Sequence, residues 1–256
     1  MTKADLAADL EAARRGRFTI TSRRGTGDAV SLDAAYEFGL DLERERVSAG
    51  WRPAGWKLGF TNQALWSTLG LDRPIRARIY HETICSGDLD SADLVQPRIE
   101  PEIIVGFGVD VPPMADPDVI AAAVEWVAAG LEVVHCHFER WEMTPAEAVA
   151  DAGVHAALAI GPRAAVKADA VRSLAVATCQ LLLDGVVTAT GSGADVLGGP
   201  LDALHWLLKG LPDGLCAGEI VTTGTLTQAI PLQPGQHWEH RLSGSIALEP
   251  VHLRIR

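Results

Sequence analysis

Residues 98–108 read RIEPEIIVGFG and combine two glutamates with a run of β-branched and aromatic side chains. Such side chains, bounded by glycine, predict a β-strand. Glu100 and Glu102 are two positions apart, so an extended backbone directs both carboxylates to the same face. Two carboxylates about 6 to 7 Å apart along a strand repel each other unless a cation lies between them. This segment therefore predicts a strand-rich core that carries a cation site.

Pro101 separates the two glutamates and has no N–H group to donate. Within sheets, proline is mostly confined to edge strands, strand starts and bulges. We therefore expect residues 98–108 to lie at a sheet edge or at a strand start, with the local backbone open to a cavity.

Short apolar runs interrupted by Gly, Pro and Asp continue from residue 55 to the C-terminus. Segments rich in β-branched residues predict strands at WKLGF (56–60), ARIYHETI (77–84), LEVVHCHF (131–138), EIVTTGTLT (219–227) and SIALEPVHLRIR (245–256). CQLLLDGVVTATG (179–191) predicts a hairpin that turns at Asp184-Gly185. Helices are predicted for PDVIAAAVEWVAAG (117–130) and for GPLDALHWLLKGL (199–211), the latter from Pro200 to Gly210. Few helices among irregularly ordered strands indicate the α+β class.

Two helices are predicted ahead of this strand-rich part. Apolar side chains recur at helical spacing in residues 3–16. Ser31 is expected to cap a second helix that ends at Gly50. We expect residues 1–50 to form a helical cap on a core of residues 51–256, both parts of one compact unit.

The composition excludes several classes of protein. The chain has 256 residues, 48% hydrophobic and 21% charged, which is typical of a globular protein. Its formal net charge of -11 would repel nucleic acid and anionic lipid, so neither is an expected partner. No run reaches about 18 apolar residues, so no membrane span is expected. Four widely spaced cysteines and an N-terminus without a signal-peptide pattern predict free thiols in the cytoplasm.

Glu132 adds a third carboxylate, in the apolar run GLEVVHC, where a buried glutamate is costly without a partner. Three carboxylates suit a hard cation such as Mg²⁺ or Mn²⁺, which takes oxygen ligands and keeps positions for water and a chelating substrate. A solvated strand edge carrying Glu100 and Glu102, with Glu132 on the surface, explains the spacing equally well. The spacing alone leaves both interpretations open.

Five longer motifs carry a resemblance to a known family: GWKLGFTNQALWSTLGLDRP (55–74), IEPEIIVGFG (99–108), GLEVVHCHFERWEMTPAEAVAD (130–151), TATGSGADVLGGPLDALHWLLKGL (188–211) and AGEIVTTGTLTQAIPLQPG (217–235). From about residue 30 to the C-terminus, the chain resembles the 2-hydroxypenta-2,4-dienoate hydratase and 4-oxalocrotonate decarboxylase branch of the fumarylacetoacetate hydrolase superfamily. The resemblance implies a mixed β-sheet roll preceded by helices, assembled as a homo-oligomer.

The same resemblance implies a divalent-metal-dependent lyase that acts on a short 2-oxo or 2-hydroxydienoic acid. It assigns Mg²⁺ or Mn²⁺ to Glu100, Glu102 and Glu132. It also matches Lys57, in GWKLG, to the active-site lysine of the family. Taken alone, Lys57 could equally reach water along its stem, or serve as a proton-transfer group whose pKa burial and a cation lower.

Other side chains are candidates for substrate contact. Arg76 and Arg78 share a face if their segment is extended, and they could bind a carboxylate or be ordinary surface arginines. Cys136 shares the strand face of Glu132 by alternation, so it could approach the metal cavity or be a small buried hydrophobe. Ser192 lies in a Gly-rich loop without the Lys-Ser/Thr ending of a phosphate loop, and the resemblance makes that loop substrate-facing.

The chain departs from the hydratase pattern at Ile75, where hydratases tend to carry an acidic residue, and this puts water activation in doubt. His155 replaces a small polar residue and is a candidate acid or base. The alternative activity is a hydrolase that cleaves a C–C bond in an acylpyruvate, with His81 beside Glu82, or His155 with Asp151, as the base.

A third, non-catalytic hypothesis is a degenerate homologue that serves as an assembly partner. The intact carboxylates and Lys57 argue against it, because nothing structural requires that combination. His135 and His137 lack further ligands at zinc-site spacing, so we expect packing or surface roles for both.

Overall fold

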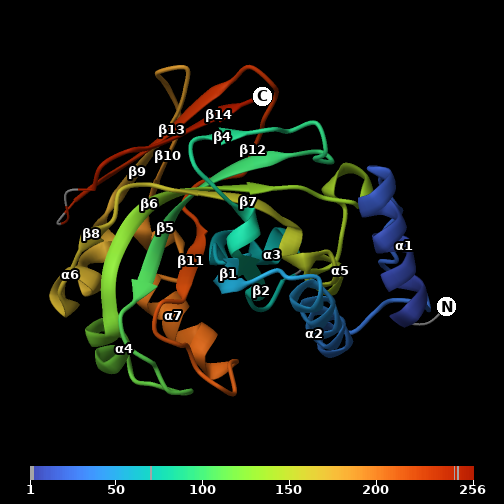
Figure 1. The fold of residues 1–256 in the computed structure, drawn as a ribbon, viewed down its shortest axis with the longest axis horizontal. Helices are drawn as coiled ribbons and strands as arrows, with labels where there is room; N and C mark the ends of the chain where they lie inside the picture. Colours follow the sequence, from blue (N-terminus) through green and yellow to red (C-terminus); the bar gives the residue numbers. More distant parts are fainter. Residues whose placement is uncertain (1–2, 70, 245, 247) are drawn as a thin grey trace.

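The computed structural model describes residues 3–69, 71–244, 246 and 248–256 (Figure 1). Its α-helices are α1 (Lys3–Gly16), α2 (Leu32–Ser48), α3 (Trp66–Leu69), α4 (Pro117–Ala123), α5 (Pro145–Ala150), α6 (Ala168–Arg172) and α7 (Pro200–Lys209). None of the helices in these described residues is long and apolar enough to cross a bilayer.

The larger of two sheets is mixed and strongly curled (Figure 1). Its strands are β1 (Pro53–Gly59), β2 (Ile75–Tyr80), β3 (Ile84–Cys85), β5 (Arg98–Phe107), β6 (Val124–Val134), β7 (His155–Ile160), β8 (Ala164–Ala165), β11 (Ile220–Thr225) and β12 (Ile230–Pro231). They follow the order β2-β1-β11-β5-β6-β7-β3, with β12 beside β5 and β8 beside β6. Two pairs, β1 with β11 and β3 with β7, are parallel, which confirms the predicted mixed sheet.

The second sheet contains β4 (Asp88–Leu89), β9 (Thr178–Leu183), β10 (Val186–Ser192), β13 (His237–Ser243) and β14 (Val251–Ile255). Their order is β10-β9-β13-β14-β4. The predicted hairpin with its turn at Asp184-Gly185 is confirmed as β9 and β10, and the predicted helix from Pro200 is confirmed as α7. The predicted C-terminal strand is confined to β14, and Ser245 and Ala247 at its expected start lie outside the described residues.

The main hydrophobic core lies on one face of the curled sheet. Ile103 on β5 and Val127 on β6 are fully buried there together with side chains of α4, α7 and the second sheet, such as Ile120, Leu204 and Leu253. Strand alternation directs Glu100, Glu102 and their neighbours to the opposite face. The core therefore holds one face of β5 and β6 rigid while the other face is free to build a site.

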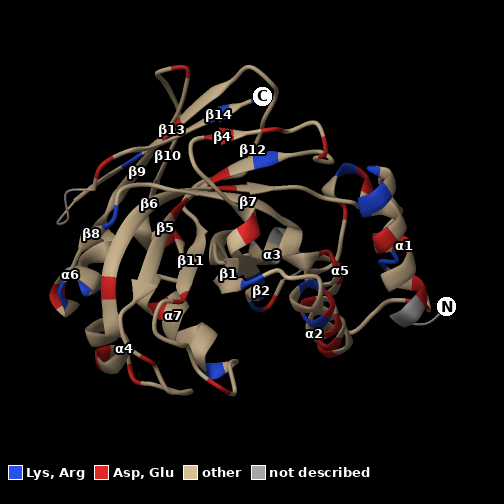
Figure 2. Ribbon diagram, in the orientation of Figure 1, with Lys and Arg blue, Asp and Glu red and all other residues tan. Residues whose placement is uncertain are grey.

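The N-terminal helices pack on α5 and not on the main core. Leu6 and Leu10 of α1 and Ala35 of α2 share a buried cluster with Phe138 and Val149. The Ser31 side chain accepts a hydrogen bond from the Ala34 N–H, so the predicted cap of α2 is confirmed. Figure 2 shows mixed acidic and basic positions along α2, whereas the strands of the curled sheet are mostly uncharged.

The predicted helix over residues 117–130 is wrong beyond Ala123, where the chain enters β6. The Ala-rich sequence favours a helix, but β6 is paired along its length with β5 and is buried on both faces, which removes the alternation that marks a strand. Gly130 lies so close to β5 that a Cβ there would come 2.4 Å from the Ile104 side chain. Pairing in the sheet outweighs local propensity here.

The expectation that Pro101 lies at a sheet edge or a strand start is also wrong, because β5 is central and Pro101 is in its interior. On one side Pro101 is opposite Leu131 of β6. On the other side β11 ends at Thr225 and β12 begins at Ile230, so the ladder is interrupted beside Pro101. The Pro101 carbonyl still accepts a hydrogen bond from the Leu226 N–H. The missing N–H thus falls where a regular partner strand is absent.

Candidate metal centre

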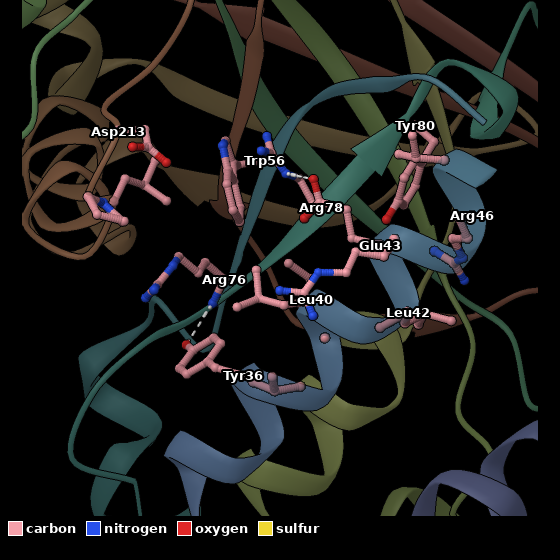
Figure 3. A pocket seen from close by; sticks show the side chains of 18 of the residues that line it. Tyr36, Leu40, Leu42, Glu43, Arg46, Trp56, Arg76, Arg78, Tyr80 and Asp213 are labelled. Carbon is pink, nitrogen blue, oxygen red and sulfur yellow. Dashed lines mark hydrogen bonds and ion pairs between the residues drawn. The ribbon is translucent and has the colours of Figure 1, made fainter. Parts of the chain in front are cut away.

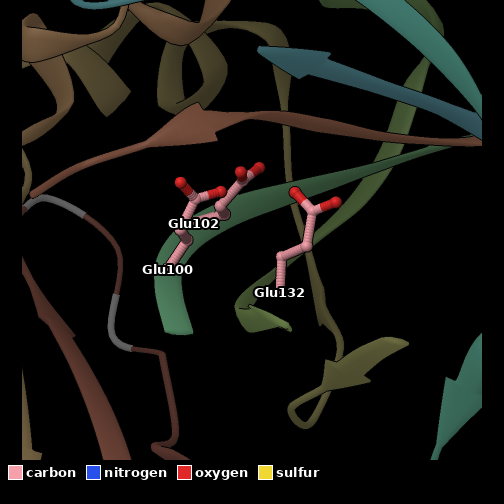
Figure 4. Close-up of side chains that lie close together, drawn as sticks. All are labelled: Glu100, Glu102 and Glu132. Atoms are coloured by element: carbon pink, nitrogen blue, oxygen red, sulfur yellow. The ribbon is translucent and has the colours of Figure 1, made fainter. Parts of the chain in front are cut away.

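Three carboxylates converge on the face of the curled sheet opposite the main core. Glu100 and Glu102 project from the same face of β5, and Glu132 on β6 stands directly opposite Glu100 in the antiparallel register (Figure 4). One oxygen from each carboxylate lies within 4.8 Å of the others. Glu102 and Glu132 are fully buried and Glu100 is partly exposed, so the centre is closed on the sheet side. These three side chains could hold a divalent cation.

The negative charge of the three carboxylates exceeds the positive charge that Lys57 supplies to the centre. Burial, reinforced by the neighbouring carboxylates, raises the pKa of Glu102 well above its ordinary range. Burial also raises the pKa of Glu100 to about 7, although Lys57 opposes the change. At Glu132, burial is outweighed by Lys57 and by the hydrogen bond from His155, so its pKa is lowered. Without a cation, the three carboxylates cannot all be ionised at neutral pH without a large cost.

Hydrogen bonding leaves oxygen atoms available at the same place. The Gly224 N–H donates to Glu102 Oε2 at 2.9 Å, while Glu102 Oε1 is buried without a partner among the described residues. Glu132 Oε2 and the hydroxyls of Thr61 and Thr222 are orphaned in the same way. Buried polar atoms are rarely left unpaired. Ligand atoms that are all oxygen suit Mg²⁺ or Mn²⁺. The carboxylate oxygens of the centre therefore fit the expected hard cation.

Gly224 is required by this geometry. Its φ of +111° is unfavourable for other residues, and a Cβ would come 2.0 Å from Thr61 Oγ1. The absence of a side chain lets the backbone N–H reach Glu102 and lets Thr61 approach the centre.

Lys57 reaches the centre from β1. In the parallel pairing of β1 and β11 it is in register with Thr222. Its ammonium group donates to the Gly153 carbonyl at 2.8 Å and lies 3.5 Å from Glu132 Oε1, with 3% of the side chain exposed. Burial alone would lower the pKa of Lys57, as the sequence argument expects, but the three nearby carboxylates raise it more. In the metal-free protein the Lys57 side chain is therefore a charged ammonium group.

His155, at the start of β7, joins the centre through Glu132. Its Nδ1 lies 2.7 Å from Glu132 Oε1, and its Nε2 lies 2.8 Å from Thr83 Oγ1. An ionised carboxylate only accepts hydrogen bonds, so Nδ1 carries the proton that is shared with Glu132. Thr83 in turn lies 2.9 Å from the Tyr80 carbonyl. His155 thus orients one oxygen of Glu132 and leaves the orphaned Oε2 for a cation.

The pairing of His155 with Asp151, considered for a hydrolase, is not formed. Asp151 accepts instead from His137, with Nδ1 2.9 Å from Oδ1, and from Arg14 of α1 at 3.2 Å. Packing or surface roles were expected for His137, and it is 1% exposed, so its role is the buried one. Burial lowers the pKa of the adjacent His135 to about 4, so this histidine is neutral at pH 7.

A left-handed turn connects the polar group around Asp151 to the group formed by Lys57, Glu132 and His155. Ala152, Gly153 and Val154 have φ values of 54°, 67° and 55°. A Cβ on Gly153 would come 2.5 Å from the Ala77 side chain and 3.2 Å from Lys57 Cδ. The turn thereby brings the Gly153 carbonyl to the Lys57 ammonium and places His155 next to Glu132.

Arg76 and Arg78 share a face of β2 as predicted, but they line a separate cavity away from the carboxylates. Arg78 is already neutralised, with Nε 2.9 Å from Glu43 and Nη1 2.7 Å from Glu219. Arg76 stacks over the Tyr36 ring at 4.4 Å. Neither arginine is in position to hold a substrate at the carboxylate centre.

The remaining candidate residues, Cys136, Ser192 and His81, make local structural contacts or lie at the surface. Cys136 comes after the end of β6, so the alternation argument does not apply, and its Sγ packs 3.5 Å from Met143 Sδ. The Ser192 side chain accepts a hydrogen bond from the Ala194 N–H in a capping turn. His81 is exposed and has no ion pair with Glu82, which binds Arg52 instead. The His81–Glu82 base considered for a hydrolase is therefore not formed.

Besides Gly224, four residues of the centre were not identified from the sequence: Thr61, Thr83, Gly153 and Thr222. Thr222 had a usable signal, because alternate positions of a strand share a face. The others are contributed by turns, and turn residues carry no periodicity from which their position could be inferred.

The fold and the centre define a strand-rich α+β protein with a buried carboxylate site for a hard cation. Residues 73–250 match the family described as fumarylacetoacetate (FAA) hydrolase C-terminal. The chain belongs to this family, which confirms the resemblance found in its motifs.

Several relatives are similar over most of their length. A 2-keto-4-pentenoate hydratase of Burkholderia vietnamiensis is 31% identical over 255 residues, covering 94% of each chain. A 4-oxalocrotonate decarboxylase of Pseudomonas sp is 29% identical over 213 residues, covering 81% of this chain and 82% of that protein. The solved structure of 4-oxalocrotonate decarboxylase from Pseudomonas putida G7, complexed with magnesium and adipate, has a TM-score of 0.90 and 25% identity, covering 99% of this chain and 97% of that one.

Proposed function

We propose that this protein is a divalent-metal-dependent lyase that acts on a short 2-oxo or 2-hydroxydienoic acid. The observation that carries the proposal is the set of orphaned oxygens on Glu102 and Glu132 beside the Lys57 ammonium, in a family whose similar members include named hydratases and decarboxylases. Glu100, Glu102 and Glu132 would hold Mg²⁺ or Mn²⁺. The cation would stabilise negative charge on the oxygens of a chelating 2-oxo acid.

Lys57 is the proposed proton-transfer residue. The Gly153 carbonyl accepts a hydrogen bond from the ammonium group at 2.8 Å, and Glu132 Oε1 lies 3.5 Å from it, so the position of the group is fixed. A fixed ammonium group can donate a proton to a substrate whose negative charge increases during the reaction. With 3% of its side chain exposed, the ammonium group is itself shielded from bulk water.

His155 is proposed to act through Glu132 and not on the substrate. Both of its ring nitrogens are engaged, by Glu132 and by Thr83. It therefore sets the direction of the Glu132 carboxylate, as histidine–carboxylate pairs do around metal sites.

Ile75 favours decarboxylation over water addition as the reaction of this protein. Its side chain is buried and lies 3.0 Å from where a Cβ on Gly59 would be, on the side of Gly59 that also faces the Lys57 ammonium. An aliphatic side chain cannot activate water, whereas hydratases of this group tend to have an acidic residue here. Water addition is the second candidate, because relatives at 31% identity are named hydratases.

A panel of substrates tests the proposal. The Mg²⁺-loaded protein is incubated with 2-oxohex-3-enedioate, 2-hydroxypenta-2,4-dienoate and an acylpyruvate, and the products are identified by NMR and by CO₂ release. Release of CO₂ from the first supports the decarboxylase, and hydration of the second supports the hydratase. Cleavage of the acylpyruvate alone, or turnover of none of the three, would contradict the proposal.

A matched pair of variants connects any turnover to the centre. Glu100→Gln should abolish it, because the ligand loses its charge. Glu125→Gln changes an exposed glutamate on the same β6 that carries Glu132 and should retain it. Equal activity of the two variants would show that the carboxylate centre is not the active site.

We further propose a homo-oligomer in the cytoplasm. The family resemblance supports the oligomer, and four free thiols, at Cys85, Cys136, Cys179 and Cys216, support a reducing compartment. Sedimentation velocity on the purified protein tests the first, and a monomer at micromolar concentration would contradict it. Fractionation of the source cells tests the second.

A further inference from the structure

A cavity of about 570 Å³ lies between α2, the edge strand β2 and residues 211–214 (Figure 3). This volume is in the range of sites that bind small molecules. Among the residues that the structure describes, Lys57 and the three carboxylates are not part of its wall. Trp56, Arg76 and Arg78 of the wall are on the face of β1 and β2 opposite Lys57. These three side chains are therefore directed away from the proposed active site, although Ala77 and Ala152 of the wall adjoin Gly153, which binds Lys57.

The wall is locally basic in a protein whose net charge is -11. It contains four arginines and two acidic residues, namely Arg44, Arg46, Arg76, Arg78, Glu43 and Asp213. Arg78 is neutralised by Glu43 and by Glu219. Within the described part of the chain, Arg76 and Arg46 have no carboxylate partner, and both are partly or largely covered. Two arginines of the wall thus carry positive charge that no carboxylate of the described residues neutralises, which is complementary to an anion.

Aromatic and aliphatic surfaces form the rest of the wall. The Arg76 guanidinium stacks over Tyr36 at 4.4 Å, and that of Arg78 stacks over Trp56 at 3.8 Å. Leu40 is 51% exposed within this wall. Rings and an exposed leucine next to unpaired guanidinium groups are complementary to a ligand with a flat apolar body and an acidic end.

Gly210, at the end of α7, lies close to the Arg76 guanidinium. A Cβ at residue 210 would come 2.7 Å from Arg76 Nη1. Glycine at this position lets the Arg76 guanidinium approach the end of α7, and a larger residue would require the guanidinium to shift. Because the group is held there by stacking and not by a carboxylate, its donors remain available to a ligand.

We propose that this cavity is a second ligand site, for an organic carboxylate with a flat unsaturated or aromatic body. The carboxylate binds the Arg76 guanidinium in a bidentate manner, and the body lies against Tyr36, Trp56 and Leu40. Arg46, stacked with Tyr80 at 5.0 Å, adds positive charge to the site.

Crystals of the Mg²⁺-loaded protein soaked with 4-bromocinnamate test the location directly. The anomalous signal of bromine is expected between Tyr36 and Trp56, with the carboxylate at Arg76. A bromine signal only at the carboxylate centre, or none in the cavity, would overturn the proposal. So would a side chain of a second copy of the protein that fills the cavity in the same crystals.

Calorimetric titration of the Mg²⁺-loaded protein with cinnamate tests the chemistry in solution. Arg76→Gln is expected to weaken binding at least tenfold. Arg163→Gln is the matched control, because Arg163 also stacks over a ring, that of Trp126 at 4.3 Å, but is not in the wall. Equal affinity of both variants would contradict the proposal.

Leu40→Trp provides a second variant for the case that Arg76→Gln does not fold. Leu40 is half exposed on α2, so a larger side chain there should fold normally and fill part of the cavity. It is expected to weaken cinnamate binding without changing any charge. Binding as tight as in the unsubstituted protein would show that cinnamate is bound elsewhere.

Discussion

Replacing Glu100 with glutamine should stabilise the metal-free protein at alkaline pH. Burial, with a contribution from Glu132 and against the effect of Lys57, raises the pKa of Glu100 from 4.5 to about 7. Below pH 4.5 the carboxyl is protonated in both the folded and the unfolded chain, so it does not affect stability. Above pH 7 the carboxyl is ionised in both states, and the buried charge destabilises the folded state.

The magnitude follows from the interval between the two pKa values. An interval of about 2.5 pH units corresponds to about 3 kcal/mol, lost between pH 4.5 and pH 7. Glutamine has nearly the same shape and no charge, so it removes this cost. For a chain of this size, about 3 kcal/mol corresponds to roughly 6 to 12 °C in melting temperature.

Denaturant unfolding in the presence of EDTA, at pH 5 and pH 8, measures the effect. Glu100→Gln should exceed the unsubstituted protein in stability by about 3 kcal/mol at pH 8 and by much less at pH 5. Glu125→Gln is the control, since Glu125 is exposed on β6. A Glu100→Gln variant no more stable than the control at pH 8 would refute this account of the centre.

Three further outcomes are expected. Mg²⁺ or Mn²⁺ should raise the melting temperature of the unsubstituted protein but not of Glu132→Gln, as measured by differential scanning fluorimetry; an equal rise in both would place the cation elsewhere. Gly224→Ala should lower the free energy of unfolding by more than about 2 kcal/mol, because its Cβ meets Thr61 at 2.0 Å, whereas Gly185→Ala, with positive φ but open space, should cost only about 1 kcal/mol. Lys57→Met should lower kcat by about 10² to 10⁴ on the substrate that is turned over, and an unchanged kcat would exclude it from proton transfer.

The alternation of side chains along a strand explains why the shared face of Glu100 and Glu102 could be predicted from the sequence. Glu100 and Glu102 had to share a face once residues 98–108 were extended, whatever the rest of the fold. The helix caps at Ser31 and Gly210 and the turn at Asp184-Gly185 were readable for a similar reason, since each depends on a local backbone preference.

Local patterns failed where the sheet imposed its own requirements. Residues 124–134 have helical composition, yet pairing with β5 makes them a strand. Pro101 is tolerated in a central strand because the neighbouring ladder is interrupted beside it. Both outcomes depend on which strands are neighbours, and this information is not local.

By itself, the sequence determined the family, the α+β class and the carboxylate pair of Glu100 and Glu102. The assembly of the centre was decided only by the tertiary structure. Lys57 lies three strands from Glu132 in the sheet order, a distance of about 14 Å in a flat sheet, and only the curl brings the two side chains to 3.5 Å. The partner of His155 was likewise decided by the pairing of β6 and β7. It sets His155 opposite Val134, two residues along β6 from Glu132, and the His155 ring reaches Glu132 while Asp151 binds His137.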